Sequence, residues 1–234
     1  MPLLLLPNLL GSAAQTHLFL PASVDIAMTT LDGLIAESEG GGRSYLKRFR
    51  TKKRAHEMPI ALLNPKMDAK YLDFLLEPII EGETWGVVSD SGLPCLADPG
   101  SALVLRARQL ALPLEAFVGP SSIFLSLMQS GLPGQRFVFH GYIAKEPENR
   151  KKELKAWENS SKKEQETHIF IEAPYRNLHT LASCLEVLSE KTLLSVACDL
   201  TLPTQEIKTG PLFMWKKGSL PEIAKRPAIF LFYA

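Results

Sequence analysis

The fold of this chain is decided by one stretch, WGVVSDSGLPCLADPG at residues 85–100. It begins as a short apolar run, which is typical of a buried strand. The run enters a loop rich in Ser, Asp, Gly and Pro, and two turns follow each other before an apolar, helix-like segment begins at Ser101. In open α/β sheets, small ligands bind beyond the carboxyl ends of the strands. We therefore expect this loop to form part of a ligand site.

Strand-like and helix-like segments alternate on both sides of this loop. The strands predicted up to residue 119 are 3–6, 33–36, 60–63, 86–89 and 114–118. The helices predicted between them are 45–50, 69–81 and 101–111. This alternation is typical of a mostly parallel sheet. Residues 1–119 are therefore predicted to form an N-terminal α/β lobe.

The pattern changes in the second half of the chain. The elements predicted there are a helix at 123–129, strands at 137–142, 167–172, 193–200 and 228–233, and helices at 148–159 and 176–188. We expect residues 120–234 to form a C-terminal α/β lobe with a mixed sheet. With 46% hydrophobic content, the 234 residues can bury one large core or two modest ones, and the two lobes are expected to share a cleft.

Composition narrows the class of protein. The formal net charge is only +1, so the chain lacks the general basic excess of many nucleic-acid-binding proteins. Its three cysteines are widely spaced, which argues against a disulfide framework or a zinc site and favours a reducing compartment. No run approaches the roughly 20 apolar residues of a membrane span. We expect a cytoplasmic protein with no metal site and no membrane segment.

The stretch at 85–100 resembles the signature of the tetrapyrrole methylase superfamily, and within it the branch of the ribosomal RNA small subunit methyltransferase I enzymes. That signature reads S-D-A-G-T-P followed by S-D-P-G, and the chain has SDSGLP at 89–94 and ADPG at 97–100. Other segments resemble the pattern in the same order: VGPSS (118–122), SGLPGQRF (130–137), FHGYI (139–143), IFIEAPYR (169–176) and ACDLT (197–201). The resemblance extends over most of the chain.

This resemblance implies two unequal α/β lobes of the class III methyltransferase type, with S-adenosylmethionine in the cleft between them. The residues that it assigns to cofactor contact are Pro7, Gly92, Leu93, Pro94, Leu96, Ser121, Ser122, Ala173 and Ala228. Loops of Gly, Ser and Pro suit such contacts, because small side chains let a ligand approach the backbone. From the sequence alone, turn and capping roles stay open for these residues, and Ser121 and Ser122 fit an ordinary helix start equally well.

The segment IAESE at 35–39 resembles the family's I-A-A-E-D-T-R-H-T on the acceptor side. Glu37 is retained, whereas Ser38 replaces the Asp and Gly40 replaces the Arg, and the glycines at 40–42 predict a pliable loop. A ribose hydroxyl is a poor nucleophile near neutral pH, so some group must accept its proton, and Glu37 is the candidate catalytic base. A solvated acid at a strand end is its alternative role.

Two further acceptor-side motifs also depart from the pattern. Asn64 matches the Asn of the family's H-N-E and is a candidate substrate contact, but Pro65 replaces the Glu. Cys198 and Asp199 stand in place of an R-E pair. These changes leave methyl-donor binding well supported and weaken the transfer of the RNA substrate from the family to this chain.

A basic segment, RSYLKRFRTKKR at residues 43–54, follows the Glu37 segment. Tyr45 and Phe49 lie among its cations, a mixture suited to phosphate contact and base stacking. The candidate RNA-binding residues of the segment are Arg43, Lys47, Arg48, Lys52 and Lys53. A helix that buries both aromatic rings in the core would give the same spacing.

The expected function is methyl transfer from S-adenosylmethionine to RNA, and the resemblance implies a ribose 2′-hydroxyl of small-subunit rRNA as acceptor. Two alternatives stay open: a methyltransferase for another acceptor such as a tetrapyrrole, and a non-catalytic protein that binds S-adenosylmethionine or RNA. The basic segment favours RNA over a tetrapyrrole. A homodimer is also expected, because dimers are common in the family and the segment around 124–137 has more apolar residues than one short helix needs to cover a single face of the core. Those residues are Phe124, Leu125, Leu127, Met128, Leu132 and Phe137.

Overall fold

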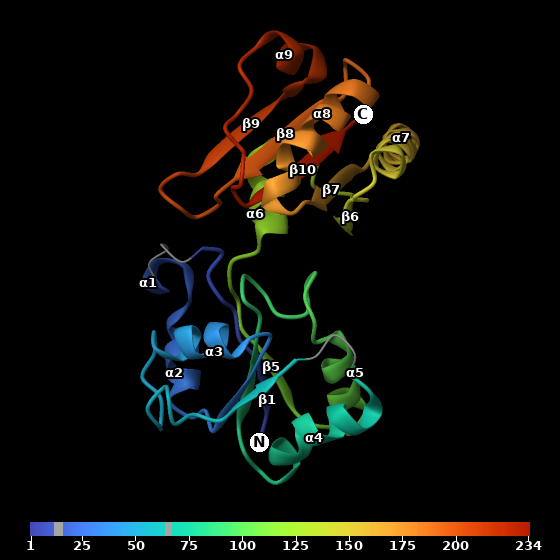
Figure 1. The fold of residues 1–234 in the computed structure, drawn as a ribbon. Coiled ribbons are helices and arrows are strands. Elements are labelled where there is room, and N and C mark those ends of the chain that lie inside the picture. Colours follow the sequence, from blue (N-terminus) through green and yellow to red (C-terminus); the bar gives the residue numbers. More distant parts are fainter. Residues whose placement is uncertain (12–15, 64–66) are drawn as a thin grey trace. The chain divides into compact units, whose positions relative to one another are not determined.

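The computed structural model describes residues 1–11, 16–63 and 67–234 of the chain (Figure 1). These residues form two compact units, Met1–Ser121 and Ser122–Ala234. Each unit is built of helices and one five-stranded sheet. Over the described ranges, no helix is long and apolar enough to cross a membrane.

The sheet of the first unit is wholly parallel. Its strands are β1 (Leu3–Leu5), β2 (Gly33–Ala36), β3 (Ile60–Leu62), β4 (Trp85–Val88) and β5 (Leu114–Ala116). They lie in the order β3-β2-β4-β1-β5, and every neighbouring pair runs parallel. β2 and β4 are buried along their whole length, as expected where helices cover both faces of a parallel sheet.

Helices cover both faces of this sheet. They are α1 (Thr16–Phe19), α2 (Ala22–Met28), α3 (Glu39–Leu46), α4 (Ala69–Ile80) and α5 (Ser101–Gln109). Met28 and Tyr45 join α2 and α3 to the core on one face, whereas Leu76 and Leu103 join α4 and α5 to the core on the other. The helices that follow β1 therefore pack on one face of the sheet, whereas α5, which follows the neighbouring strand β4, packs on the opposite face. This is a topological switch point, where open α/β sheets form a crevice for ligands.

α3 begins earlier than predicted, and its first turn contains the glycines at 40–42. The Gly41 N–H donates a hydrogen bond to the Ser38 hydroxyl (3.0 Å), which caps the helix. A Cβ on Gly41 would lie 2.2 Å from Asp90 Oδ1. The prediction of a pliable loop here is therefore wrong, because the glycines let a capped helix start close to the loop after β4.

The sheet of the second unit is mixed. Its strands are β6 (Phe137–Tyr142), β7 (Thr167–Ile171), β8 (Leu193–Cys198), β9 (Glu206–Pro211) and β10 (Ala228–Tyr233). Their order is β6-β7-β10-β8-β9, in which β6 and β7 are parallel and the other neighbours antiparallel. The helices of this unit are α6 (Ser122–Ser130), α7 (Pro147–Glu164), α8 (Asn177–Val187) and α9 (Leu212–Lys217), with a 3-10 turn at Pro174–Arg176.

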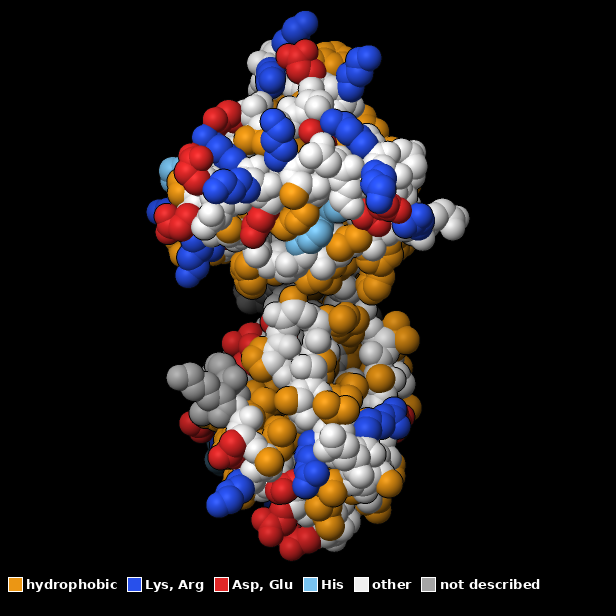
Figure 2. Space-filling view, turned by 90° about the vertical axis from the view of Figure 1, so that its right-hand side faces the viewer, with side chains coloured by type: hydrophobic (Ala, Val, Ile, Leu, Met, Phe, Trp, Pro, Cys, Tyr) orange, Lys and Arg blue, Asp and Glu red, His pale blue; other side chains and the backbone are white. Residues whose placement is uncertain are grey.

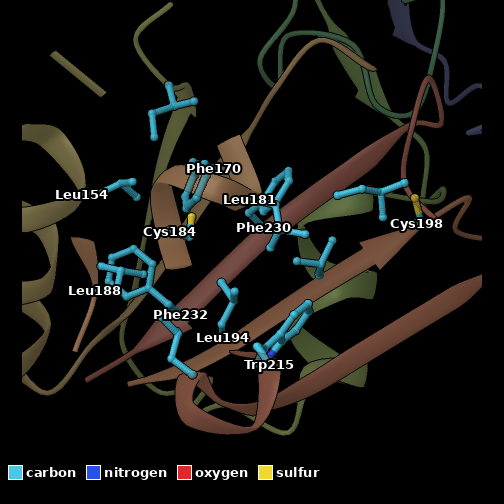
Figure 3. Packing of buried hydrophobic residues seen from close by; sticks show 14 residues of the cluster. Leu154, Phe170, Leu181, Cys184, Leu188, Leu194, Cys198, Trp215, Phe230 and Phe232 are labelled. Carbon is cyan, nitrogen blue, oxygen red and sulfur yellow. The ribbon is translucent and has the colours of Figure 1, made fainter. Parts of the chain in front are cut away.

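Aromatic side chains fill the core of the second unit (Figure 3). Phe170, Phe230 and Phe232 project from β7 and β10 towards α7, α8 and α9, and the rings of Phe170 and Phe230 stack with their centroids 5.4 Å apart. The thiols of Cys184 and Cys198 are free and lie in the same core. Because side chains alternate along a strand, the residues between these aromatics face the other side of the sheet, where α6 packs.

Candidate functional site

The loops after β1, β2, β4 and β5 lie at one edge of the first sheet, because the carboxyl ends of parallel strands share an edge. The loops after β1 and β4 flank the switch point. The predicted cofactor residues in these loops are Pro7, Gly92, Leu93, Pro94, Leu96 and Ser121. The structure therefore brings this part of the predicted set to a single edge of the first unit, and Ser122 is the first residue of α6 in the second.

Asn8 ties the loop after β1 to the loop after β4. The residue is buried, and its Nδ2 donates hydrogen bonds to the backbone oxygens of Ser89 (2.8 Å) and Asp90 (3.1 Å). Its Oδ1 accepts hydrogen bonds from the N–H of Leu9 (2.8 Å) and from Nη1 of Arg48 (2.6 Å). The amide thus uses both of its donors and both of its lone pairs. Its orientation is fixed by four partners.

Glycines allow these loops to approach one another closely. The Asn8 N–H donates to the backbone oxygen of Gly92 (2.7 Å). Gly92 has a φ of +71°, and a Cβ at this position would lie 3.2 Å from Leu10 Cδ2. A Cβ on Gly119, in the loop after β5, would lie 2.1 Å from the Cβ of Pro7. Larger residues at either glycine would push the loops apart.

The loop after β4 holds its backbone in an unusual conformation. Cys95 and Ala97 adopt left-handed φ values of 69° and 65°. Such a conformation costs about 1–3 kcal/mol for a residue other than glycine, and it is concentrated at functional sites. Gly100 has a φ of +130°, and a Cβ there would lie 2.8 Å from the Cys95 sulfur. The packing of Cys95 on Gly100 helps to hold this strained turn.

Three carboxyl groups interact at the same edge. The Asp90 N–H donates to Glu37 Oε1 (3.2 Å), and the Ser38 hydroxyl donates to Asp90 Oδ1 (3.2 Å). Burial, followed by the nearby charge of Asp98, raises the pKa of Glu37. Burial also raises the pKa of Asp98, in opposition to its hydrogen bond with Ser89. The edge is therefore acidic, and Glu37 holds a proton more readily than a solvated glutamate does.

The basic segment 43–54 uses several of its cations within its own unit. Arg43 Nη1 donates to two backbone oxygens (2.7 and 2.5 Å), and Arg48 is bound to Asn8. Lys52 Nζ lies 2.7 Å from Asp32 Oδ1, and this ion pair is one of the causes that lower the pKa of Asp32 against the opposing effect of its burial. These three cations are already engaged by protein groups.

The aromatic residues of the basic segment belong to the core. Tyr45 is fully buried, and its ring lies 4.9 Å from that of Phe49, which packs against the same cluster. The base-stacking role considered for these rings is therefore not available, and the alternative of core packing holds. Lys47 and Lys53 are exposed, and within the described part of the chain neither forms an ion pair.

The two predicted cofactor residues of the second sheet share one edge of it. Ala173 follows β7, and Ala228 begins β10, whose Ile229 pairs with Ile171 of β7. The adjacent Glu172 is buried and accepts hydrogen bonds from Arg176 Nε (2.8 Å). The Glu and Arg of the motif at 169–176 therefore bind each other.

Asp199 and Glu206 are joined by an arginine that the motifs do not contain. Arg226 Nε donates to Asp199 Oδ2 (2.9 Å), and its Nη1 lies 3.2 Å from Glu206 Oε2. Thr204 donates to the same Asp199 oxygen (2.7 Å). Arg226 thus supplies a positive charge next to position 198, where the family's arginine is replaced by Cys198. Both acids are held by this ion-pair network, and Asp199 is buried.

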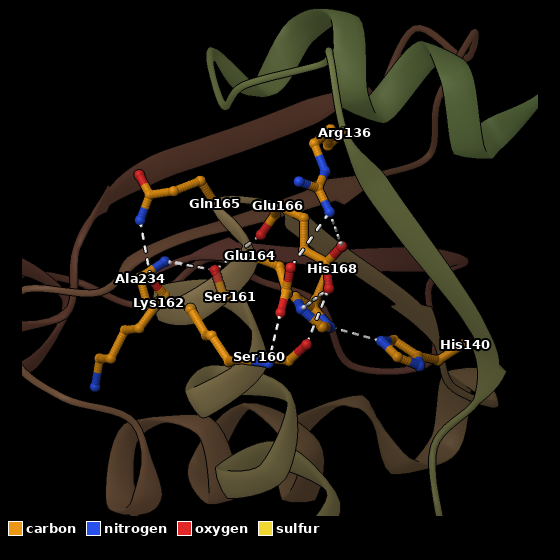
Figure 4. Close-up of polar contacts among 11 residues, drawn as sticks. Arg136, His140, Ser160, Ser161, Lys162, Glu164, Gln165, Glu166, His168 and Ala234 are labelled. Atoms are coloured by element: carbon orange, nitrogen blue, oxygen red, sulfur yellow. Dashed lines mark hydrogen bonds and ion pairs between the residues drawn. The ribbon is translucent and has the colours of Figure 1, made fainter.

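A second polar network links β6, β7 and α7 (Figure 4). His140 Nε2 lies 2.7 Å from His168 Nδ1, and His168 Nε2 lies 3.4 Å from Glu166 Oε1. Arg136 pairs with Glu166 at 3.9 Å. The His140 ring stacks on Trp157, with centroids 3.9 Å apart. Burial, followed by the neighbouring His168, lowers the pKa of His140 to about 4.

The surface of the second unit mixes all types of side chain. Figure 2 shows histidine among hydrophobic side chains on one face, with Lys or Arg and Asp or Glu interspersed around them. Such mixing gives no single-sign patch on this face. Asn64, a predicted substrate contact, lies outside the described residues. Among those that are described, no group of three His, Cys, Asp or Glu side chains could hold a metal ion.

Comparison with known proteins places the chain in a family. The family described as Tetrapyrrole (Corrin/Porphyrin) Methylases matches residues 27–214. The chain belongs to this family. The match includes the basic segment, the loop after β4 and most of the second sheet, so this methylase shares both units with the family. The predicted family resemblance is confirmed.

Curated relatives of this methylase carry the name ribosomal RNA small subunit methyltransferase I. The protein from Thermotoga maritima is 31% identical over 180 residues, which are 77% of this chain and 76% of that protein. The one from Xylella fastidiosa is 30% identical over 79% of this chain and 64% of its own length. The one from Bacillus subtilis is 33% identical over 59% of this chain and 46% of its own length. The chain thus spans less than two thirds of the second and third relatives.

Solved structures show the same fold. The methyltransferase CobJ superposes with a TM-score of 0.61 at 18% identity, over 92% of this chain and 88% of that one. A uroporphyrin-III-C-methyltransferase from Thermus thermophilus gives 0.50 at 14% identity, over 91% and 87%. The predicted α/β methylase fold is confirmed.

The structure adds residues that the motifs did not indicate. Asn8 and Asp98 join the edge of the first sheet, and Arg226 joins Asp199. Asp98 lies inside the quoted signature and could have been singled out. Asn8 lies in the loop after β1, at the carboxyl end of a strand where ligand-site residues are expected, and this position is a signal that could have found it. Arg226 offers no such signal, because it lies far along the chain from its partners.

Proposed function

We propose that this chain transfers a methyl group from S-adenosylmethionine to RNA, and that the acceptor is a ribose 2′-hydroxyl of small-subunit rRNA. Membership of the methylase family supports methyl transfer, and the names of the curated relatives support the RNA acceptor. The observation that carries the donor site is the loop cluster at the switch point, where Asn8 joins the loops after β1 and β4.

The residues of this cluster fit S-adenosylmethionine. Gly92 and Gly119 let the loops after β1, β4 and β5 approach one another closely, and the carboxylates of Asp90 and Asp98 suit a ligand with a positive sulfonium and an ammonium group. S-adenosylmethionine supplies an electrophilic methyl carbon. The proposed contacts are Pro7, Gly92, Leu93, Pro94, Leu96 and Ser121, with Ser122, Ala173 and Ala228 of the second unit.

The protein's own part in this reaction is alignment and proton removal. In-line displacement requires the acceptor oxygen to be held near the methyl carbon with water excluded. We propose that Glu37 accepts the hydroxyl proton. Its raised pKa suits this role, because a base works best when its pKa approaches the working pH. Its Oε1 is held by the Asp90 N–H, which orients the carboxylate.

RNA is proposed to contact the exposed cations of the basic segment. Lys47 and Lys53 are exposed and free of ion pairs in the described part of the chain, so they can bind phosphates without breaking a protein contact. Arg43, Arg48 and Lys52 would have to leave their present partners first. Asn64 stays a proposed substrate contact by family resemblance.

Transfer of radiolabelled methyl from S-adenosylmethionine to purified small-subunit rRNA tests the function. We expect incorporation at a ribose with the native protein, and a loss of about a hundredfold or more with Glu37→Gln, in the range that general-base catalysis contributes. Incorporation into a tetrapyrrole and not RNA would refute the acceptor. Absence of any transfer, with donor binding intact, would favour a non-catalytic protein.

Calorimetric titration with S-adenosylhomocysteine tests the donor site separately. We expect one site per chain and its loss in Gly92→Arg, because this side chain would enter the space beside Leu10. Gly82→Arg is the matched control, since Gly82 also has a positive φ, +97°, but no atom within 4 Å of an added Cβ. Equal loss of binding in both variants would show that an arginine at a positive φ disturbs the backbone, and not that Gly92 lies in the ligand site.

We also propose a cytoplasmic homodimer. α6 and the start of β6 expose apolar side chains on the second unit: Phe124 is 48% exposed, Met128 77% and Phe137 37%. The rings of Phe124 and Phe137 meet edge to face at 6.1 Å. By contrast, Leu127 and Leu132 are buried within the unit. The exposed members form an apolar patch of the kind that subunit interfaces cover.

A further inference from the structure

We infer that Arg48 is a positioning residue for the donor-binding loops, which acts through Asn8, and not a phosphate contact. The inference rests on the proposed function for the identity of the ligand, but its structural basis lies wholly in the first unit. It assigns a role to a cation that the sequence pattern grouped with RNA-binding residues.

The side chain of Arg48 is directed inward. Its guanidinium carbon lies 6.0 Å from the ring centre of Tyr45, and its Nη1 donates to Asn8 Oδ1 at 2.6 Å. The hydroxyl of Tyr45 donates to the backbone oxygen of Pro7 (3.1 Å). Tyr45 in the last turn of α3 and Arg48 just after the helix therefore bind two consecutive residues of the loop after β1, Pro7 and Asn8.

Arg48 determines which way the Asn8 amide faces. The Nδ2 group of Asn8 faces two backbone oxygens, of Ser89 and Asp90, whereas Oδ1 faces two donors. An amide turned by 180° would place oxygen against two oxygens and NH₂ against a guanidinium. A bond to a charged donor is also stronger than one between neutral groups. Arg48 thus favours the one amide orientation that holds the loop after β4.

This chain of contacts reaches the proposed donor site. The carbonyls that Asn8 binds belong to the residues just before Gly92, whose own oxygen accepts from the Asn8 N–H. Without Arg48, Asn8 Oδ1 would lose one of its two donors in a buried position. We expect the turn at 89–92 to open more often, so that part of the binding energy of the ligand is used to order it.

Calorimetric titration with S-adenosylhomocysteine measures the effect on binding. We expect Arg48→Met to weaken it by about tenfold or more, at the low end of the range for loss of one hydrogen bond to a charged group. Arg48→Lys keeps a cationic donor and should recover part of the affinity. Asn8→Ala should weaken binding at least as much, and adding Arg48→Met to it should change little more, because the arginine acts through Asn8.

Amide hydrogen exchange of the ligand-free protein supplies a readout that needs no ligand. Exchange of the amides at 89–92 should quicken in Arg48→Met, while amides of β8 and β10 in the second unit stay as in the native protein. Arg50→Met is the matched control, because Arg50 is an exposed arginine two positions away and should leave both donor binding and exchange unchanged.

The outcomes separate this inference from the proposed function. If the native protein fails to bind S-adenosylhomocysteine, the proposed donor is wrong, and the exchange data still decide the role of Arg48. Native affinity and native exchange in Arg48→Met would overturn the inference. A full additional loss in the double variant would overturn it too. So would a variant that binds the donor analogue normally but has lost salt-dependent RNA affinity.

Discussion

Two adjacent glycines of α3 offer a sharp test of how this site is packed. Gly40 and Gly41 both lie in the first turn of the helix, yet an added Cβ at Gly40 would meet nothing within 4 Å. At Gly41 it would lie 2.2 Å from Asp90 Oδ1 and 2.7 Å from Ser38 Oγ. Replacing either glycine by alanine adds one methyl group to the same helical turn. The difference in stability between the two variants therefore reports the contact of Gly41 with the loop after β4.

The expected magnitudes follow from these distances. Alanine is favoured over glycine in a helix by up to about 1 kcal/mol, so Gly40→Ala should be neutral to stabilising. In Gly41→Ala the Ser38 cap must be displaced, which costs about 1 kcal/mol. Overpacking adds about 1 kcal/mol or more, at the low end of its range because the exposed Asp90 carboxylate can turn away. We expect Gly41→Ala to be less stable than Gly40→Ala by about 2 kcal/mol.

Thermal unfolding followed by circular dichroism measures this difference. For a chain of this size, about 2 kcal/mol corresponds to a difference in Tm of roughly 4–8 °C. Titration with S-adenosylhomocysteine adds a second readout, and only Gly41→Ala should weaken binding, because only it moves Asp90. Equal Tm values and equal affinities in the two variants would refute the close packing of α3 on this loop.

Three further predictions concern other parts of the molecule. His140 and His168 have lowered pKa values in the folded state, so the unfolded chain binds more protons than the folded chain as the pH falls from about 6.5 towards 4. The free energy of unfolding should therefore fall in that window, by at most about 1.4 kcal/mol per pH unit for each proton. The free energy of unfolding in urea should depend less steeply on pH in His140→Gln. An unchanged pH dependence would show that His140 does not contribute to it. Met128→Lys should convert the proposed dimer to a monomer, as measured by light scattering, and a native protein that is already monomeric would remove this proposal. Replacing Lys47 and Lys53 together by Ala should reduce the salt slope of RNA binding by about 1.4–1.8 units without affecting donor binding, and a native slope would show that neither lysine contacts phosphate.

The sequence predicted the first sheet and its loop cluster well, and the reason is local. A parallel strand buried on both faces must be apolar along its length, and β4 with the loop at 89–100 shows this pattern followed by Gly, Ser, Asp and Pro. The start of α3 was not predicted, since glycines disfavour helices and only the Ser38 cap and the nearby Asp90 explain them. β9 was missed as well, because this edge strand ends in Gly210-Pro211 and is only partly buried.

Contacts between distant segments could not be predicted from one sequence. Arg48 and Asn8 are 40 positions apart, and the basic run around Arg48 favoured a surface role for every cation in it. Arg226 lies 27 positions from Asp199, outside any motif. In both cases the tertiary structure brings the arginine next to a buried or strand-end acceptor. The local sequence pattern around the arginine gives no sign of this contact.

Arginine contacts separate Glu37 from three other carboxylates, Glu172, Asp199 and Glu206. Glu172 accepts hydrogen bonds from Arg176, and Asp199 and Glu206 pair with Arg226. A substrate hydroxyl would have to displace an arginine to reach the paired oxygen of any of these three carboxylates. Within the described residues Glu37 forms no ion pair, and its pKa is raised by burial and by Asp98. If proton removal from a ribose hydroxyl needs a carboxylate of this chain, the arginine partners of the other three acids therefore favour Glu37. Glu172→Gln should accordingly act through stability, lowering Tm, whereas Glu37→Gln should lower the methyl-transfer rate at an unchanged Tm.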